Sequence, residues 1–142
     1  PGIRLGYLLG ADEKKIERMK RHLPEWNLSI AAQEAGYVAL KEEDYIEKSR
    51  KYIETERQYL MGELKKINID TLPSVTNFML IRQPKNQPQI NLYQKLLKKG
   101  ILIRDCSDYQ GLDSGYYRIA VKTHGENEKI IEQLTKILTE KK

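Results

Sequence analysis

The feature that most constrains the fold is a long amphipathic stretch between Glu43 and Ile67. Its uncharged side chains recur every three or four residues with charged residues between them, which is the spacing of one helix face. These side chains are Tyr45, Ser49, Tyr52, Ile53, Tyr59, Leu60, Leu64 and Ile67. A single helix of about 25 residues is about 37 Å long, at 1.5 Å per residue. Because one small domain does not need a helix of that length, we expect it to link two domains.

Composition places the chain among ordinary globular proteins. Its 142 residues allow a modest core, and 39% are hydrophobic and 32% charged. The longest apolar runs are only a few residues long, so we expect no contact with a membrane. The single cysteine, Cys106, excludes an internal disulfide and fits a reducing cytoplasm, where we expect the protein to be located.

The net charge of +5 raises the question of a nucleic-acid partner. The basic residues are scattered among acidic residues on helical faces, which favours a solvated surface over a nucleic-acid groove. His22 and His124 lie far apart in sequence without a cysteine or acid cluster. We therefore expect neither a nucleic-acid partner nor a metal site.

Shorter elements flank the long helix. The apolar run at residues 1–10 predicts a strand, and Asp12 can cap a helix whose apolar positions continue to Leu23. A second helix is expected between Trp26 and Leu40. No internal repeat interrupts this part of the chain.

The remainder alternates between strand and helix patterns. Strands are predicted at residues 76–82, 101–106 and 116–121, a helix from Pro88 to Gly100, and a last helix with Glu126 in its first turn. The order strand–helix–strand–strand–helix predicts an α/β chain of the α+β two-layer kind, with helices packed on one face of a small, mostly antiparallel sheet.

Two arginines stand out within these strands. Alternation places Arg118 opposite the apolar face of its strand, and Arg104 follows an apolar strand and precedes a loop with three aspartates. An unpaired buried guanidinium costs several kcal/mol, so each arginine needs an anion. The aspartates can supply it, and so can an external carboxylate or phosphate, which guanidinium binds through two parallel hydrogen bonds. The pattern alone leaves both interpretations open.

Several motifs carry a resemblance to a known family. PGIRLGYLLG at residues 1–10 resembles the segment after the cofactor lysine in pyridoxal 5′-phosphate (PLP) enzymes of the aspartate-aminotransferase fold type. The stretch ILIRDCSDYQGLDSGYYRIAVKTHGENEKI, residues 101–130, resembles the C-terminal signature of L-threonine-O-3-phosphate decarboxylases, down to the N-E pair at Asn127 and Glu128. TNFMLIR and the Trp26–Asn27 pair match in the same order. Histidinol-phosphate aminotransferases share PGIR-x-GY and an arginine like Arg118, but typically lack the GLDS-x-YYR wording.

The resemblance implies a domain organisation. The chain would be the C-terminal part of a fold-type I PLP-dependent enzyme, with residues 1–28 from the large PLP-binding domain and residues 29–142 forming the small domain. The Schiff-base lysine would lie upstream of Pro1, so the chain would hold no catalytic residue and be inactive alone. The intact parent is expected to be a homodimer.

The resemblance also implies roles for four residues. Arg4 matches the arginine that binds the PLP phosphate, and Arg118 matches the one that holds the substrate carboxylate. Arg104 matches a second substrate-site arginine, shared with the substrate phosphate, and Asn77 falls near the substrate. The sequence departs from the pattern at Lys122 and Gly115, where arginine is expected.

The implied substrate is a small phosphorylated amino acid, and the leading hypothesis is decarboxylation of L-threonine O-3-phosphate to (R)-1-amino-2-propanol O-2-phosphate in cobalamin biosynthesis. A histidinol-phosphate-type aminotransferase is the alternative. A non-enzymatic module that binds an anionic partner is the second alternative.

Overall fold

The structure, a computed structural model, describes residues 2–84 and 89–139. The chain divides into two compact units, Pro1–Glu47 and Lys48–Lys142. This division falls within the long helix α3, Glu43–Lys66. The presence of α3 confirms the long helix predicted from the sequence. The boundary between residues 28 and 29 concerns membership in two enzyme domains and stays a prediction.

The first unit holds two short helices. In α1, Glu13–Lys20, the Asp12 side chain accepts a hydrogen bond from the Lys15 backbone N–H at 3.1 Å, as its capping role predicts. Ser29 caps α2, Ile30–Ala39, in the same way. The prediction of a strand at residues 1–10 is wrong, because residues 2–10 form no strand. A strand needs a neighbour for its backbone hydrogen bonds, and the described part of this unit contains no other strand.

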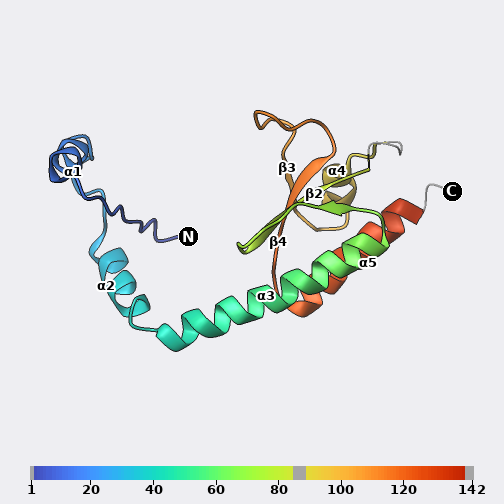
Figure 1. The fold of residues 1–142 in the computed structure, drawn as a ribbon, viewed down its shortest axis with the longest axis horizontal. Helices are drawn as coiled ribbons and strands as arrows, with labels where there is room; N and C mark the ends of the chain where they lie inside the picture. The colour runs from blue at the N-terminus through green and yellow to red at the C-terminus, as the bar shows by residue number, and fades with distance from the viewer. Residues whose placement is uncertain (1, 85–88, 140–142) are drawn as a thin grey trace. The chain divides into compact units, whose positions relative to one another are not determined.

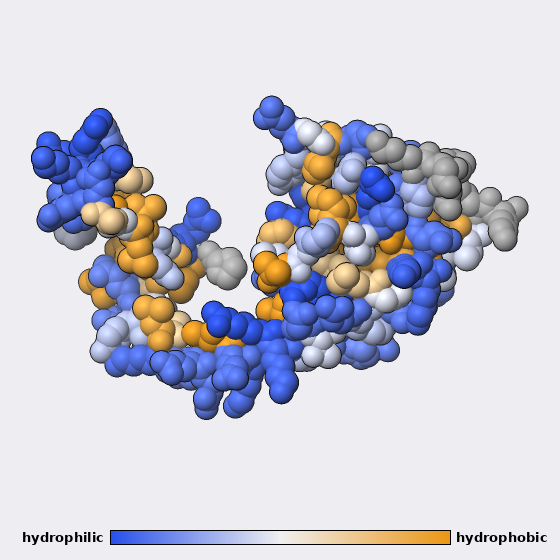
Figure 2. Space-filling model, in the orientation of Figure 1, coloured by the Kyte–Doolittle hydropathy of each residue, from blue (hydrophilic) through white to orange (hydrophobic). Residues whose placement is uncertain are grey.

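The C-terminal half of helix α3 has a buried stripe and a well-closed end. Leu60 and Leu64 are fully buried, whereas Figure 2 shows mainly hydrophilic residues along the outer edge of the helix. The Ile69 N–H donates to the Leu64 carbonyl at 3.0 Å, and Asn68 turns the chain with a φ of 56°. This is the left-handed closure with which helices commonly end.

The second unit contains a four-stranded antiparallel sheet with the order β1-β2-β4-β3. Its strands are β1 Asp70–Thr71, β2 Phe78–Arg82, β3 Arg104–Asp105 and β4 Tyr116–Ala120. The two-residue β1 was not predicted. The strand expected at residues 101–106 is shorter than predicted, because only Arg104 and Asp105 are paired with β4.

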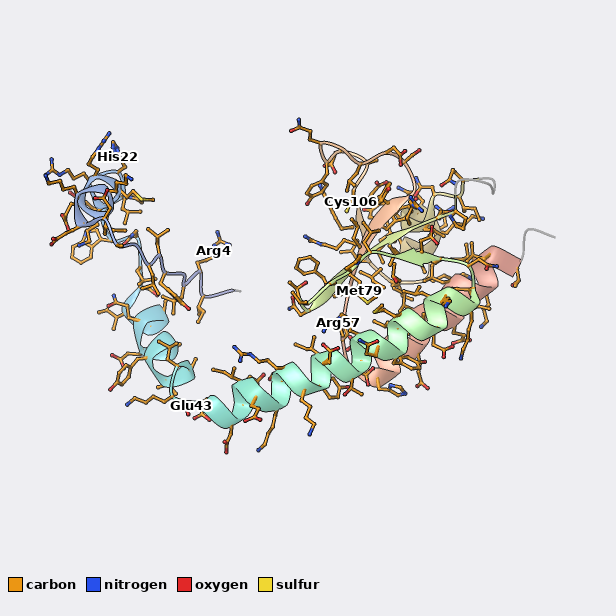
Figure 3. All side chains as sticks on the ribbon, viewed as in Figure 1. Arg4, His22, Glu43, Arg57, Met79 and Cys106 are labelled. Carbon is orange, nitrogen blue, oxygen red and sulfur yellow. The ribbon has the colours of Figure 1, made fainter. Side chains whose placement is uncertain are left out.

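Helices α3, α4 (Leu92–Leu97) and α5 (His124–Thr139) supply the rest of the core on one face of this sheet. Figure 1 shows α3 and α5 running together along that face. Met79 of β2, fully buried, lies between the sheet and α3 (Figure 3). The other core residues of the two central strands are Ile81, Tyr117 and Ile119. The α+β two-layer prediction is therefore confirmed.

Helix α4 begins later than the sequence suggested. The expected start at Pro88 lies outside the described residues, and the helix begins at Leu92 with the Asn91 side chain accepting from the Gln94 N–H. Gly100 closes it with a φ of 73°, as predicted. No helix in the described ranges combines the length and apolar character that crossing a membrane requires.

Candidate functional site

Arg104 of β3 and Arg118 of β4 are direct cross-strand partners. Both side chains project from the exposed face of the sheet, while the alternate residues Tyr117 and Ile119 are buried in the core. Like charges directly opposite each other destabilise an antiparallel pair. An anion that neutralises both guanidinium groups removes that cost, so the arrangement favours anion binding.

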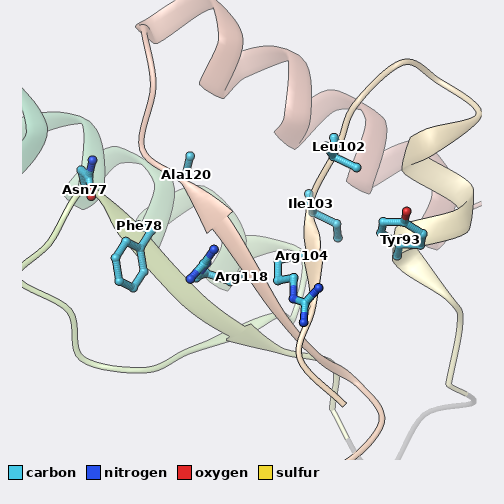
Figure 4. Close-up of a pocket in the computed structure, with 8 residues that line it drawn as sticks. All are labelled: Asn77, Phe78, Tyr93, Leu102, Ile103, Arg104, Arg118 and Ala120. Carbon is cyan, nitrogen blue, oxygen red and sulfur yellow. The ribbon is translucent and has the colours of Figure 1, made fainter. Parts of the chain in front are cut away.

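The two arginines line a pocket of about 580 Å³ on this face. Figure 4 shows Asn77 at the start of β2 and the arginines on neighbouring strands around the pocket. Three residues predicted to contact the substrate thus come together in one place. The remaining lining residues are Phe78, Tyr93, Leu102, Ile103 and Ala120.

Arg104 already has an internal partner. Its guanidinium lies 2.6 Å from Asp108 Oδ2, and this carboxylate raises the pKa of Arg104 above its ordinary value. The Tyr109 ring lies beside the guanidinium, 5.6 Å from the ring centre to Cζ. Both members of the ion pair are largely exposed, and such pairs contribute little to stability. The pair can therefore open for a stronger anion.

Arg118 differs from Arg104, because no carboxylate of the described residues lies within ion-pair distance of it. Its guanidinium lies 5.0 Å from the centre of the Phe78 ring, a diagonal neighbour on the same face. The side chain is exposed. Contrary to the expectation from the sequence, burial does not force an anion onto Arg118; the like-charge pairing with Arg104 favours an anion instead.

The two departures from the expected pattern have local explanations. Gly115 has a φ of 103°, and a Cβ there would lie 2.6 Å from Gln89 Oε1, so an arginine would strain the backbone. Lys122 forms an ion pair with Glu126 and lies outside the residues that line the pocket. Neither position supplies a cation to this pocket.

Cys106 lies next to the site and is buried. Burial raises the pKa of its thiol, and the positive charges of Arg118 and Arg104 oppose that shift only in part. The thiol stays protonated near neutral pH, which suits a structural role rather than that of a nucleophile.

Arg4 belongs to the first unit, whereas all residues that line the pocket belong to the second. It adopts a φ of 54°, which is uncommon for a residue with a side chain and often marks functional sites. Next to it, Leu5 packs against Gly36 of α2, where a Cβ would lie 2.1 Å from Leu5 Cδ2. Arg4 is exposed and has no carboxylate partner among the described residues. A free guanidinium of this kind fits a phosphate group.

No role was predicted for the apolar lining of the pocket. Alternation along β4 places Ala120 on the same face as Arg118, whereas the position of Phe78 depends on the register between β2 and β4. Tyr93 comes from α4 and Leu102 from the loop before β3, so only the tertiary fold brings them to the site.

Comparisons with known proteins give the family. The sequence profile of "Aminotransferase class I and II" matches residues 1–134, and enzymes of this family use PLP. The chain is 37% identical over 139 residues to the histidinol-phosphate aminotransferase of Methanosphaera stadtmanae, covering 96% of the chain and 38% of that relative. It is 34% identical over 140 residues to the threonine-phosphate decarboxylase of Salmonella typhimurium, covering 98% of the chain and 38% of that relative.

A solved structure agrees with these sequences. The fold matches the histidinol-phosphate aminotransferase of Clostridium acetobutylicum with a TM-score of 0.90 and 34% identity, over 99% of this chain and 42% of that one. The chain thus spans less than half the length of the relatives it matches. Because the family profile covers nearly all of its sequence, the chain belongs to the class I and II aminotransferase family.

Proposed function

We propose that this chain forms the C-terminal part of a PLP-dependent decarboxylase that converts L-threonine O-3-phosphate to (R)-1-amino-2-propanol O-2-phosphate. The observation that carries the proposal is the opposed pair Arg104 and Arg118 on one wall of a pocket. The substrate has two anionic groups, a carboxylate and a phosphate, and the pair offers one guanidinium to each. The GLDS-x-YYR motif at residues 111–118 supports this substrate.

Each arginine has its own role in this proposal. Arg118, which has no carboxylate partner among the described residues, binds the substrate carboxylate. Arg104 exchanges its exposed partner Asp108 for the substrate phosphate. Guanidinium can hold either group through two hydrogen bonds, which fixes direction as well as distance. Asn77 contributes a polar side chain at the edge of the same pocket.

The two arginines control which bond breaks by orienting the substrate. Bound PLP supplies an electron sink for a bond to the amino-acid Cα. Arg104 and Arg118 would grip both ends of the substrate and so determine which bond to Cα is presented for cleavage, here the bond to the carboxylate. Arg118 must orient the carboxylate without holding it too tightly, because departing CO2 is neutral and a tight grip stabilises the ground state. Arg4 is the proposed contact to the cofactor phosphate.

A histidinol-phosphate aminotransferase is the second candidate, and its support is the similar identity of the two curated relatives. Its substrate also carries a phosphate, which Arg104 would bind. This reaction breaks the Cα–H bond and needs a keto acid to accept the amine. In either case we propose that the whole enzyme is a homodimer.

Product analysis by mass spectrometry separates the two reactions. The full-length protein that contains this chain is incubated with PLP and L-threonine O-3-phosphate, without a keto acid. We expect aminopropanol phosphate and CO2. Absence of a decarboxylated product, with amine transfer to 2-oxoglutarate once it is added, would instead establish the aminotransferase.

A further inference from the structure

Two adjacent residues of α3, Glu56 and Arg57, are charged and nonetheless buried, with 6% and 5% of their surface exposed. Burying a charge is costly unless it is paired and hydrogen-bonded. Other charges of α3 are more exposed, such as Lys66 with 70% of its side-chain surface accessible, and carry a smaller cost. The hydrogen-bond partners of Glu56 and Arg57 therefore indicate which parts of the structure these buried charges hold in place.

Arg57 reaches the beginning of β2. Its Nη1 donates a hydrogen bond to the Thr76 carbonyl at 3.0 Å, and its other terminal nitrogen forms an ion pair with Glu54. Figure 3 shows Arg57 on the side of α3 that faces the strands. Thr76 directly precedes Asn77, which lines the pocket. Arg57 thus holds the backbone from which Asn77 projects.

Glu56 reaches the end of β4 through Asn127, which is 1% exposed. Asn127 Nδ2 donates to Glu56 Oε2 at 2.9 Å and to the Lys122 carbonyl at 3.0 Å. Asn127 Oδ1 accepts a hydrogen bond from the Lys122 N–H, also at 3.0 Å. His124 Nδ1 lies 3.1 Å from the same carboxylate. Glu56 therefore orients the amide that fixes both backbone groups of Lys122, two residues after Ala120 of the pocket.

These two attachments meet at one end of the sheet. Because β2 and β4 are antiparallel, the start of β2 lies beside the end of β4, with Phe78 paired to Ala120. The Val121 N–H donates to the Asn77 carbonyl at 2.9 Å and joins the two strands there. Adjacent residues of one helix thus hold both strands at the edge of the pocket.

We propose that Glu56, Arg57 and Asn127 are positioning residues that set the placement of Asn77 and Arg118 for the substrate. The proposal rests on the proposed function, because it assigns these residues to the same pocket. It also gives a role to Asn127, which belongs to the N-E pair of the sequence signature. The three residues act through the strands and do not line the pocket themselves.

The test uses the PLP-loaded full-length protein and variants that remove single attachments. Arg57→Met keeps the volume and removes the donors, and Arg57→Lys restores one donor. Asn127→Leu removes the amide. We expect the Kd for phosphoglycolate, an unreactive probe that carries both a carboxylate and a phosphate, to rise about 10-fold in Arg57→Met and Asn127→Leu when measured by calorimetry. Substrate KM should rise by a matching factor, because small misplacements at a site cost factors of 10 to 100. Arg57→Lys should recover most of the affinity.

Glu63→Gln changes a partly exposed charge that pairs with Lys66 of the same helix, and as the matched control it should keep wild-type values. Should Asn127→Leu fail to fold, Arg57→Met and Arg57→Lys decide the question. A lower melting temperature with unchanged Kd and KM overturns the positioning role and leaves the pocket intact. If wild-type protein and Arg118→Ala bind phosphoglycolate equally, the proposed site fails and this inference fails with it.

Discussion

Arg104 and Arg118 lie directly opposite each other across β3 and β4, and both side chains line one pocket. Only Arg104 has a carboxylate partner among the described residues, and that partner, Asp108, is exposed. The local repulsion between the two cations and the accessible position of both explain why an anionic ligand suits this face.

Replacing Arg118 with alanine should lower kcat/KM about 100-fold or more, because charged hydrogen bonds to the substrate carboxylate are lost. The variant should still bind PLP, which the cofactor absorbance of the full-length protein reports. Arg82→Ala is the matched control, since Arg82 is another arginine of the sheet but pairs with Asp70. Full activity of Arg118→Ala would remove Arg118 from the site.

Asp108→Asn should strengthen the binding of inorganic phosphate several-fold, because Arg104 no longer has a competing carboxylate. The urea midpoint of unfolding should hardly change, since both members of the ion pair are largely exposed. Calorimetric titration of the PLP-loaded protein measures the affinity. Weaker phosphate binding in this variant would show that Asp108 does not compete for Arg104.

Tyr117→Phe should lower the free energy of unfolding by about 1–3 kcal/mol, the usual cost of leaving buried groups without a partner. The Tyr117 hydroxyl donates to the Ile90 carbonyl at 3.2 Å and accepts from the Leu92 N–H at 3.3 Å, which joins β4 to the start of α4. Urea denaturation measures the change. Tyr45→Phe, at an exposed position, should have no effect, and equal stability of the two variants would contradict the assignment.

Glu126 gives the fold a pH dependence. Hydrogen bonds from Lys122 and then from Thr123 lower the pKa of Glu126 from 4.5 to about 2. A carboxylate whose folded pKa is lowered stabilises the fold above its unfolded pKa, and this contribution is lost as the pH falls towards 2. The free energy of unfolding of wild type should therefore exceed that of Glu126→Gln at pH 7. The difference between the two free energies should shrink between pH 4.5 and pH 2. A difference that does not vary with pH would contradict this.

Much of this fold could be predicted because local signals and burial agree. The 3.6-residue periodicity of α3, the cap at Asp12 and the closing Gly100 each have a local physical cause, and the structure contains all three. Alternation along β4 likewise separated Arg118 from the core residues Tyr117 and Ile119. The family followed from short motifs rather than from these periodicities.

The features that could not be predicted from the sequence depend on contacts between residues distant along the chain. The strand expected at residues 1–10 requires a neighbour. The direct opposition of Arg104 and Arg118 depends on a register that the sequence between them, residues 105–117, does not reveal. The buried charges Glu56 and Arg57 looked like part of the polar face of α3, and only the packing of β2 and α5 against the helix distinguishes them.

The most direct measurement is the specificity ratio of the full-length enzyme for L-threonine O-3-phosphate over L-threonine, compared among wild type, Arg104→Ala and Arg118→Ala. If Arg104 binds the phosphate and Arg118 the carboxylate, Arg104→Ala should abolish most of the preference for the phosphorylated substrate. Arg118→Ala should lower kcat/KM for both substrates by a similar factor and leave the ratio near its wild-type value. An unchanged ratio in Arg104→Ala, or normal turnover in Arg118→Ala, would contradict the two-anion assignment of this pocket.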